Sequence, residues 1–362
     1  MFPRAGEGDR PPRGGVGPAA TRTIVLMVTT FTGRATGRGR ALGHRLPAVA
    51  LAWVTAYGIV RVYWASGHQP DDLSPVGDDL VAFTGWGGVA LCGAAAAVLA
   101  VLALPSADRL GRVPRLAVTA TAWATALCLV ASGALLLLDV VGGILPGLGI
   151  GFYPLGALSR IAVVGAGIMT GLSARAYTAR ARTGCAACGR PGTAPGPLAR
   201  TPAWAFWAAS LAVAGCVARI AAQAAVGFGE SPMSSGPSVV LFEAGFVLGG
   251  SLLPLALVHS FGRVWPRWVP GLAGRRVPRR LVLWPGAAIS GGLVVYFGLM
   301  LLEMCWERLH GRNPFPPEGG LDLPEAFFWV AVPAYFAWGA GMAVAARAYA
   351  RRTRTPCASC GR

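Results

Sequence analysis

Long apolar stretches alternate with short polar segments along most of this chain. A run of about 20 apolar residues is long enough to cross a bilayer as a helix. Lipid offers no hydrogen-bond partner to the backbone, so a spanning segment is a helix or part of a closed barrel. The runs lack the period-two alternation of barrel strands. The pattern predicts eight membrane-spanning helices, near residues 46–66, 80–104, 116–139, 152–174, 202–226, 237–261, 281–304 and 325–346.

The segments that follow the fourth and the eighth predicted helix are nearly identical. Residues 175–190 and 347–362 share eleven of sixteen positions at a constant offset of 172. A fainter match joins Asp139, at the end of the third helix, to Glu303, at the end of the seventh. Four helices return the chain to its starting side of the membrane. We therefore expect two parallel tandem repeats, related by an axis along the membrane normal.

The predicted fold class is an all-α membrane protein of eight transmembrane helices, built as two parallel tandem four-helix repeats. Its organisation has four parts: a disordered basic tail, a first repeat, a Pro/Gly-rich linker and a second repeat. These parts cover residues 1–45, 46–190, 191–200 and 201–362, and each repeat ends in C-x-x-C-G-R.

Composition supports a membrane protein and argues against nucleic acid binding. Hydrophobic residues make up 54% of the chain and charged residues only 13%, whereas a soluble domain carries about 25% charged residues. The net charge of +17 comes from 32 arginines without a lysine, a bias typical of a GC-rich bacterial genome. Most arginines lie between the predicted helices, where membrane topology accounts for them. We therefore expect no nucleic acid partner.

The arginines are unevenly distributed between the two sides of the predicted helices. Alternate segments place 27 of them on one side, while the loops of the other side hold only Arg308 and Arg312. Cytoplasmic loops carry the excess of positive charge in membrane proteins. We predict a multi-pass protein of the bacterial cytoplasmic membrane, with both termini in the cytoplasm and the lipid bilayer as its partner. A small-molecule substrate and the oligomeric state are not indicated.

The two C-x-x-C-G-R motifs contain Cys185 and Cys188 in the first copy and Cys357 and Cys360 in the second. The predicted topology places both motifs in the cytoplasm, where thiols stay reduced. Together they supply the four thiolates of a tetrahedral zinc site. The glycine after the second cysteine of each motif allows a tight turn with positive φ. We predict one shared zinc site; a redox dithiol and an inert tail are the alternatives.

Six of the charged residues within the predicted helices or at their ends are candidates for a polar site in the membrane. A charge in lipid is costly and normally pairs or lines a cavity. This candidate intramembrane polar site consists of Arg61, Asp139, Arg160, Arg219, Glu243 and Glu303. Within the first repeat we expect Arg61 to pair with Asp139. Within the second repeat we expect the matching pair of Arg219 and Glu303. The alternative is that each of these four side chains reaches the outer interface separately.

Arg160 and Glu243 lie deeper, roughly 9–12 Å from the helix ends by the helical rise. Neither has a charged counterpart in the other repeat. We expect their side chains to meet at the seam between the repeats, or to share a polar cavity there with Arg61 or Arg219. Such a place could hold a substrate or a proton, or it could be a structural ion pair.

The first helix pair contains the segments Arg61–Gly67 (RVYWASG) and Phe83–Gly87 (FTGWG). In these segments the chain resembles uncharacterised multi-pass integral membrane proteins of high-GC actinobacteria. The resemblance covers the first repeat, rests largely on Trp64 and Trp86, and implies no known activity.

Three hypotheses for the function remain open. The first is a carrier or permease-like protein for a small solute, because tandem repeats create sites at their interface near the membrane midplane. The second is a non-transporting scaffold or sensor with a cytoplasmic four-cysteine metal or redox site. The third is a membrane enzyme that acts on a lipid or quinone. The sequence favours a protein that is not an enzyme, because it has only four histidines and none of the common hydrolase or nucleotide-binding motifs.

Overall fold

The computed structural model describes only part of the chain, and every structural statement below concerns that part. The described residues are 35–71, 73–74, 85–145, 151–180, 185, 196, 198–227, 237–315, 323–357 and 360–361. Contacts divide the chain into two units, Met1–Arg45 and Leu46–Arg362. Most of the predicted basic tail lies outside the described residues.

The described part of the first half is helical. Its elements are α2 (Ala35–Tyr63), the turn η1 (Trp64–His68), α3 (Gly85–Ala103), the turn η2 (Pro105–Arg109), α4 (Arg112–Ala131), α5 (Leu136–Ile144) and α6 (Pro154–Arg180). The second half contains α7 (Ala203–Val226), α8 (Pro237–Val258), the turn η3 (Ser260–Gly262), α9 (Arg279–Leu309) and α10 (Glu325–Arg352). Eight segments are long and apolar enough to cross a membrane, as predicted, and no strand occurs in the described ranges.

The third predicted helix differs from the expectation of one continuous helix over 116–139. Helix α4 ends at Ala131, a turn follows, and α5 begins at Leu136. The Ser132 hydroxyl donates back to the carbonyls of Cys128 and Leu129, and Ser–Gly pairs are common sites of helix kinks. The break falls a few residues before Asp139, which takes part in an ion pair described below.

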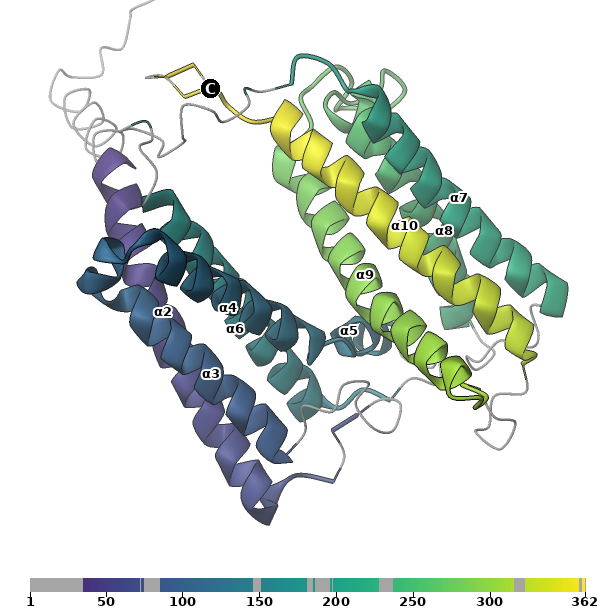
Figure 1. Ribbon diagram of the computed structural model, residues 1–362. Coiled ribbons are helices and arrows are strands. Elements are labelled where there is room, and N and C mark those ends of the chain that lie inside the picture. Colours follow the sequence, from purple (N-terminus) through teal and green to yellow (C-terminus); the bar gives the residue numbers. More distant parts are fainter. Residues whose placement is uncertain are drawn as a thin grey trace, which may run out of the picture. The chain divides into compact units, whose positions relative to one another are not determined.

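Each half forms its own packed group of helices. In Figure 1, α3, α4 and α6 lie side by side, as do α7, α8, α9 and α10. A buried cluster in the first group joins α2 to α3, α4 and α6 through residues such as Val54, Leu99 and Leu129. A larger cluster in the second group surrounds Trp338 and Met342 of α10. Additional contacts join α4 and α5 to α9.

Small residues bring several helices into close contact. A Cβ atom on Gly167 of α6 would lie 2.8 Å from the Ala126 carbonyl oxygen of α4. Close approach of this kind is typical of helix packing in membranes. In contrast, a Cβ atom on Gly245 or Gly249 of α8 would meet nothing within 4 Å. Their G-x-x-x-G spacing therefore marks no helix contact among the described residues.

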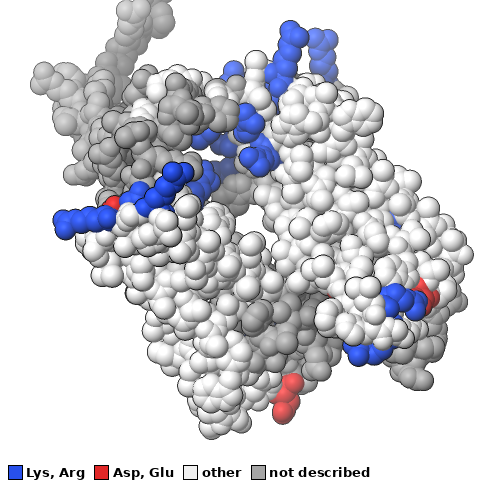
Figure 2. All heavy atoms as spheres, viewed as in Figure 1, with Lys and Arg blue, Asp and Glu red and all other residues white. Residues whose placement is uncertain are grey.

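Large apolar side chains cover the outward faces of the helices. The exposed fraction is 76% for Trp207, 67% for Trp284 and 65% for Leu127. Soluble monomers rarely expose contiguous apolar surface on this scale. Figure 2 shows that, in this view, the sides of the helices carry almost no charge and that arginine atoms gather near the helix ends. This distribution suits a lipid environment around the helices.

Candidate functional site

Three cysteines from the two repeated motifs come together beyond the ends of α6 and α10. The sulfur atoms of Cys185, Cys357 and Cys360 lie within 4.8 Å of one another, and all three residues are half-buried. Although 172 residues of sequence separate Cys185 from Cys357, the two motifs meet in space. The prediction that the motifs converge is confirmed for these three residues. The fourth predicted ligand, Cys188, lies outside the described residues.

The geometry of the cluster suits a thiophilic metal ion. In a tetrahedral zinc site, Zn–S bonds of about 2.3 Å place the sulfurs about 3.8 Å apart, so the three sulfurs need only a small inward movement. Gly361 has a φ of +67°, and its amide donates to the Cys357 carbonyl over 2.8 Å. The tight turn with positive φ expected after the second cysteine is confirmed at this motif.

A buried ion pair lies in the first helix group. Nη1 of Arg160, on α6, lies 3.0 Å from both carboxylate oxygens of Asp139, on α5. The side chains are only 6% and 1% exposed. The predicted pair of Arg61 and Asp139 is therefore wrong. Asp139 lies on α5, beyond the break that follows α4, and faces Arg160 of α6.

A second ion pair lies in the other helix group. Nη1 of Arg219, on α7, lies 2.9 and 3.0 Å from the carboxylate oxygens of Glu243, on α8. Nε of Arg219 donates to the hydroxyl of Tyr335, on α10, over 2.9 Å. The guanidinium also lies 4.8 Å from the centre of the Phe246 ring, within the range of a cation–π contact. Two neighbouring helices, α8 and α10, therefore supply the partners of this one arginine.

The predicted meeting of Arg160 and Glu243 at a seam between the halves is wrong. Each residue has an oppositely charged partner inside its own helix group. The predicted pair of Arg219 and Glu303 is wrong as well, because α8 places Glu243 beside the arginine. Glu303 is exposed on α9, and no ion pair of Glu303 is found among the described residues. The structure thus separates the six predicted residues into different places.

Arg308 and Arg312 are the two arginines predicted to lie in loops on the side with few arginines. Each forms an ion pair with a nearby acidic residue. Arg308 contacts Glu325 at the start of α10. Nη2 of Arg312 donates to Glu307 over 2.7 Å, and this contact raises the pKa of the Arg312 guanidinium above its usual value. These exposed pairs lie at the ends of α9 and α10 away from the cysteine cluster. They contribute little to stability.

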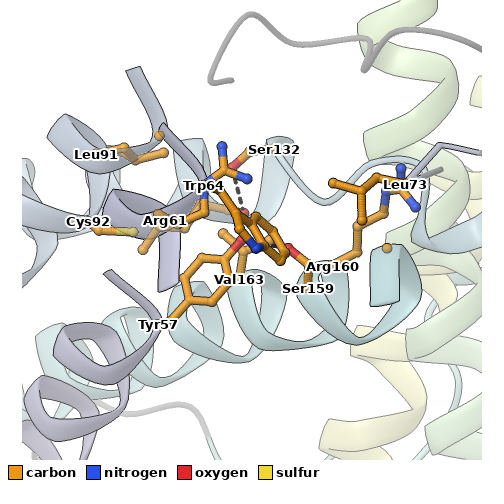
Figure 3. A pocket seen from close by; sticks show the side chains of 13 residues that line it. Tyr57, Arg61, Trp64, Leu73, Leu91, Cys92, Ser132, Ser159, Arg160 and Val163 are labelled. Atoms are coloured by element: carbon orange, nitrogen blue, oxygen red, sulfur yellow. Dashed lines mark hydrogen bonds between the residues drawn. The ribbon is translucent and has the colours of Figure 1, made fainter. Parts of the chain in front are cut away.

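Arg61 and Arg160 line one small cavity, as the alternative expectation of a shared polar cavity stated, but all its described lining residues belong to the first half. Its volume is about 40 Å³, and α2, η1, α3, α4, α6 and the segment around Leu73 supply its wall. Figure 3 shows polar side chains from α2 and α6 in this wall. The Tyr57 hydroxyl and the Ser159 hydroxyl lie 2.8 Å apart. The cavity does not reach Glu243.

Comparisons with protein-family models, with curated proteins and with solved structures find no match to this chain. The expected resemblance to actinobacterial membrane proteins thus stays a prediction.

Sequence reasoning missed Tyr335, Tyr57 and Ser159. One signal pointed to Tyr335: at the offset of 172, Val332 matches Arg160, and Tyr335 lies one helical turn further on. Residues three apart lie on the same face of a helix, so the Tyr335 hydroxyl faces the interior of the second helix group, as Val332 does. The sequence did not single out Tyr57 or Ser159, because single tyrosines and serines are common in apolar helices that have no functional site.

Proposed function

We propose that this chain is a metal-binding membrane scaffold or sensor, in which one zinc ion joins the ends of the two helix groups. The main support for this proposal is the convergence of Cys185, Cys357 and Cys360 from motifs 172 residues apart. Cys188 is proposed as the fourth ligand. Four thiolates fill the tetrahedral shell and leave no open position for a substrate. The ion therefore has a structural or regulatory role rather than a catalytic one.

The carrier hypothesis has less support. It relied on a shared site at a seam between the repeats, with a cavity reaching both deep charges. Arg160 and Glu243 belong to separate ion pairs, and the cavity beside Arg160 ends within the first helix group. Zinc binding needs no such site, and it uses the sequence motif that the two halves share most closely.

The test is the metal content of the full-length protein purified in detergent. We expect about one zinc ion per chain, and Cys357→Ser with Cys360→Ser should reduce it to background because two of four thiolates are lost. The exposed Cys305 on α9 offers a matched control: Cys305→Ser should retain the metal. Metal-free protein whose paired cysteines form a reversible disulfide would contradict zinc binding and favour the redox alternative.

The proposal also includes the two parallel tandem repeats and the orientation of the chain in the membrane. Its support is that α6 and α10 end at positions 172 apart, Arg180 and Arg352. In addition, Tyr177 donates to the Ala107 carbonyl in η2, and Tyr349 donates to the Gly262 carbonyl in η3, both over 2.8 Å. We propose that the groups are parallel repeats and that the cysteines face the cytoplasm of a bacterial cell, as the arginine distribution suggests.

The tyrosine contacts provide an independent prediction. Tyr349→Phe removes one donor and leaves the buried Gly262 carbonyl without this hydrogen bond. We expect a loss of about 1 kcal/mol in the free energy of unfolding, with a similar loss for Tyr177→Phe. Denaturant titration in mixed micelles measures both. A large loss for one variant and none for the other would contradict equivalent roles for the two residues.

A further inference from the structure

The cavity in the first helix group combines cationic and hydroxyl side chains in a confined space. Arg61 comes from the last turn of α2 and Arg160 from the second turn of α6. The hydroxyl groups of Tyr57, Ser132 and Ser159 also belong to the wall. No acidic residue is among the described residues that line it. The described part of the wall therefore offers hydrogen-bond donors and the positive charge of Arg61, whereas Asp139 balances the charge of Arg160.

The ion pair with Asp139 is compatible with this role. It is formed through Nη1 of Arg160, and a planar guanidinium can donate to more than one acceptor at once. The buried Asp139 holds the side chain in one place. Arg61 is only half-buried, and its guanidinium carbon lies 5.8 Å from the centre of the Trp64 ring. One arginine is thus fixed inside the wall and the other lies at a more accessible part of it.

The size of the cavity limits the ligand. A water molecule needs roughly 10–15 Å³ of such volume, so about 40 Å³ holds about three waters or one small ion. The chain closes tightly beside it, since a Cβ atom on Gly156 would lie 1.9 Å from the Leu73 carbonyl oxygen. A sugar, nucleotide or amino acid does not fit. An oxyanion of a few atoms does.

We propose that this cavity binds one small oxyanion, a phosphate or carboxylate group, through Arg61 and Arg160. Guanidinium forks match both groups in geometry and bind them with two parallel hydrogen bonds. The site lies near the start of α6, whereas Cys185 lies beyond its end, about 30 Å away by the helical rise. It is thus independent of the proposed zinc site. The anion has two possible sources, a free ion or the headgroup of an anionic lipid.

Cys92 makes the proposal testable, because this buried thiol belongs to the cavity wall. The probe reaction is modification by methyl methanethiosulfonate, followed by mass spectrometry of the peptide that contains Cys92. The anions are inorganic phosphate and acetate at constant ionic strength, with gluconate as an anion too large to enter. At ten times its Kd, a bound anion should slow modification of Cys92 about tenfold. Cys216, a buried thiol of the other helix group, should show no anion dependence.

Variants of Arg61 test whether the protection of Cys92 depends on an anion bound in the cavity. Arg61→Gln should abolish protection of Cys92, while Arg61→Lys should retain part of it because the charge remains. Reactivity of Cys92 equal to that of the wild type in the absence of anion shows that the first helix group of each variant is folded. Should Arg61→Gln fail this criterion, the Arg61→Lys result and the wild-type anion series still decide the matter.

The same modification experiment in micelles with and without added lipid identifies the source of the anion. Protection by phosphate or acetate in lipid-free micelles identifies a free anion. Protection only in micelles that contain phosphatidic acid, and not in those with phosphatidylcholine, identifies a lipid headgroup. If none of these slows the modification of Cys92, or if Cys216 responds equally, the cavity holds only water and the proposal is overturned.

Discussion

Replacement of Arg219 with methionine is expected to destabilise the second helix group severely. The substitution leaves a flexible, unbranched apolar side chain, shorter than arginine, and removes the cation that faces Glu243. The arginine side chain is 4% exposed, and Glu243 is 25% exposed on a helix that we expect to face lipid rather than water. Removing one partner of a buried ion pair costs about 3–5 kcal/mol. We expect a loss of this size in the free energy of unfolding in mixed micelles.

Two further variants test whether the unpaired charge of Glu243 causes the loss of stability in Arg219→Met. Glu243→Gln in the Arg219→Met background should restore part of the stability, because no buried charge remains without a partner. Arg308→Met removes an arginine from an exposed pair with Glu325 and should change stability little. If the double variant were as unstable as Arg219→Met, lost packing against Phe246 and Tyr335 would be the cause instead of the unpaired charge.

The sequence was sufficient to predict the helices. Long apolar runs specify spanning segments because the bilayer leaves the backbone no alternative to a helix. It was also sufficient for the convergence of Cys185, Cys357 and Cys360, because both motifs follow helices that end on the same side of the predicted membrane. The turn at Gly361 could be predicted as well, since glycine adopts a positive φ without strain.

The partners of the buried charges could not be predicted in the same way. The sequence gives the depth of a charge in a helix, but it does not give the rotation of that helix about its axis. Asp139 lies on α5, beyond the Ser132–Gly133 break, and its carboxylate contacts Arg160. Glu243 similarly faces Arg219 because α7 and α8 pack together. Repeat symmetry was a poor guide to these pairs, because the matching positions carry different residues in the two halves.

A substitution at Gly341 is expected to separate α7 from α10. A Cβ atom on Gly341 would lie 2.4 Å from the Ala208 carbonyl oxygen and 2.8 Å from the Ala212 backbone nitrogen. Both contacts are with backbone, which cannot move aside as a flexible side chain can. Gly215 on α7 makes a similar approach, with a Cβ atom placed 2.5 Å from the Ala334 carbonyl oxygen. The two helices therefore meet through small residues at more than one level.

Gly341→Val should accordingly lower the free energy of unfolding by about 3 kcal/mol, the upper range for overpacking a close contact. Gly245→Val on α8 is the matched control, because a Cβ atom there meets nothing within 4 Å. Both variants add the same β-branched side chain to a membrane helix, so the difference between them isolates the helix contact. Equal stability of the two variants in mixed micelles would contradict the close packing of α7 against α10. A loss confined to Gly341→Val would identify that contact as a main source of stability in the second helix group.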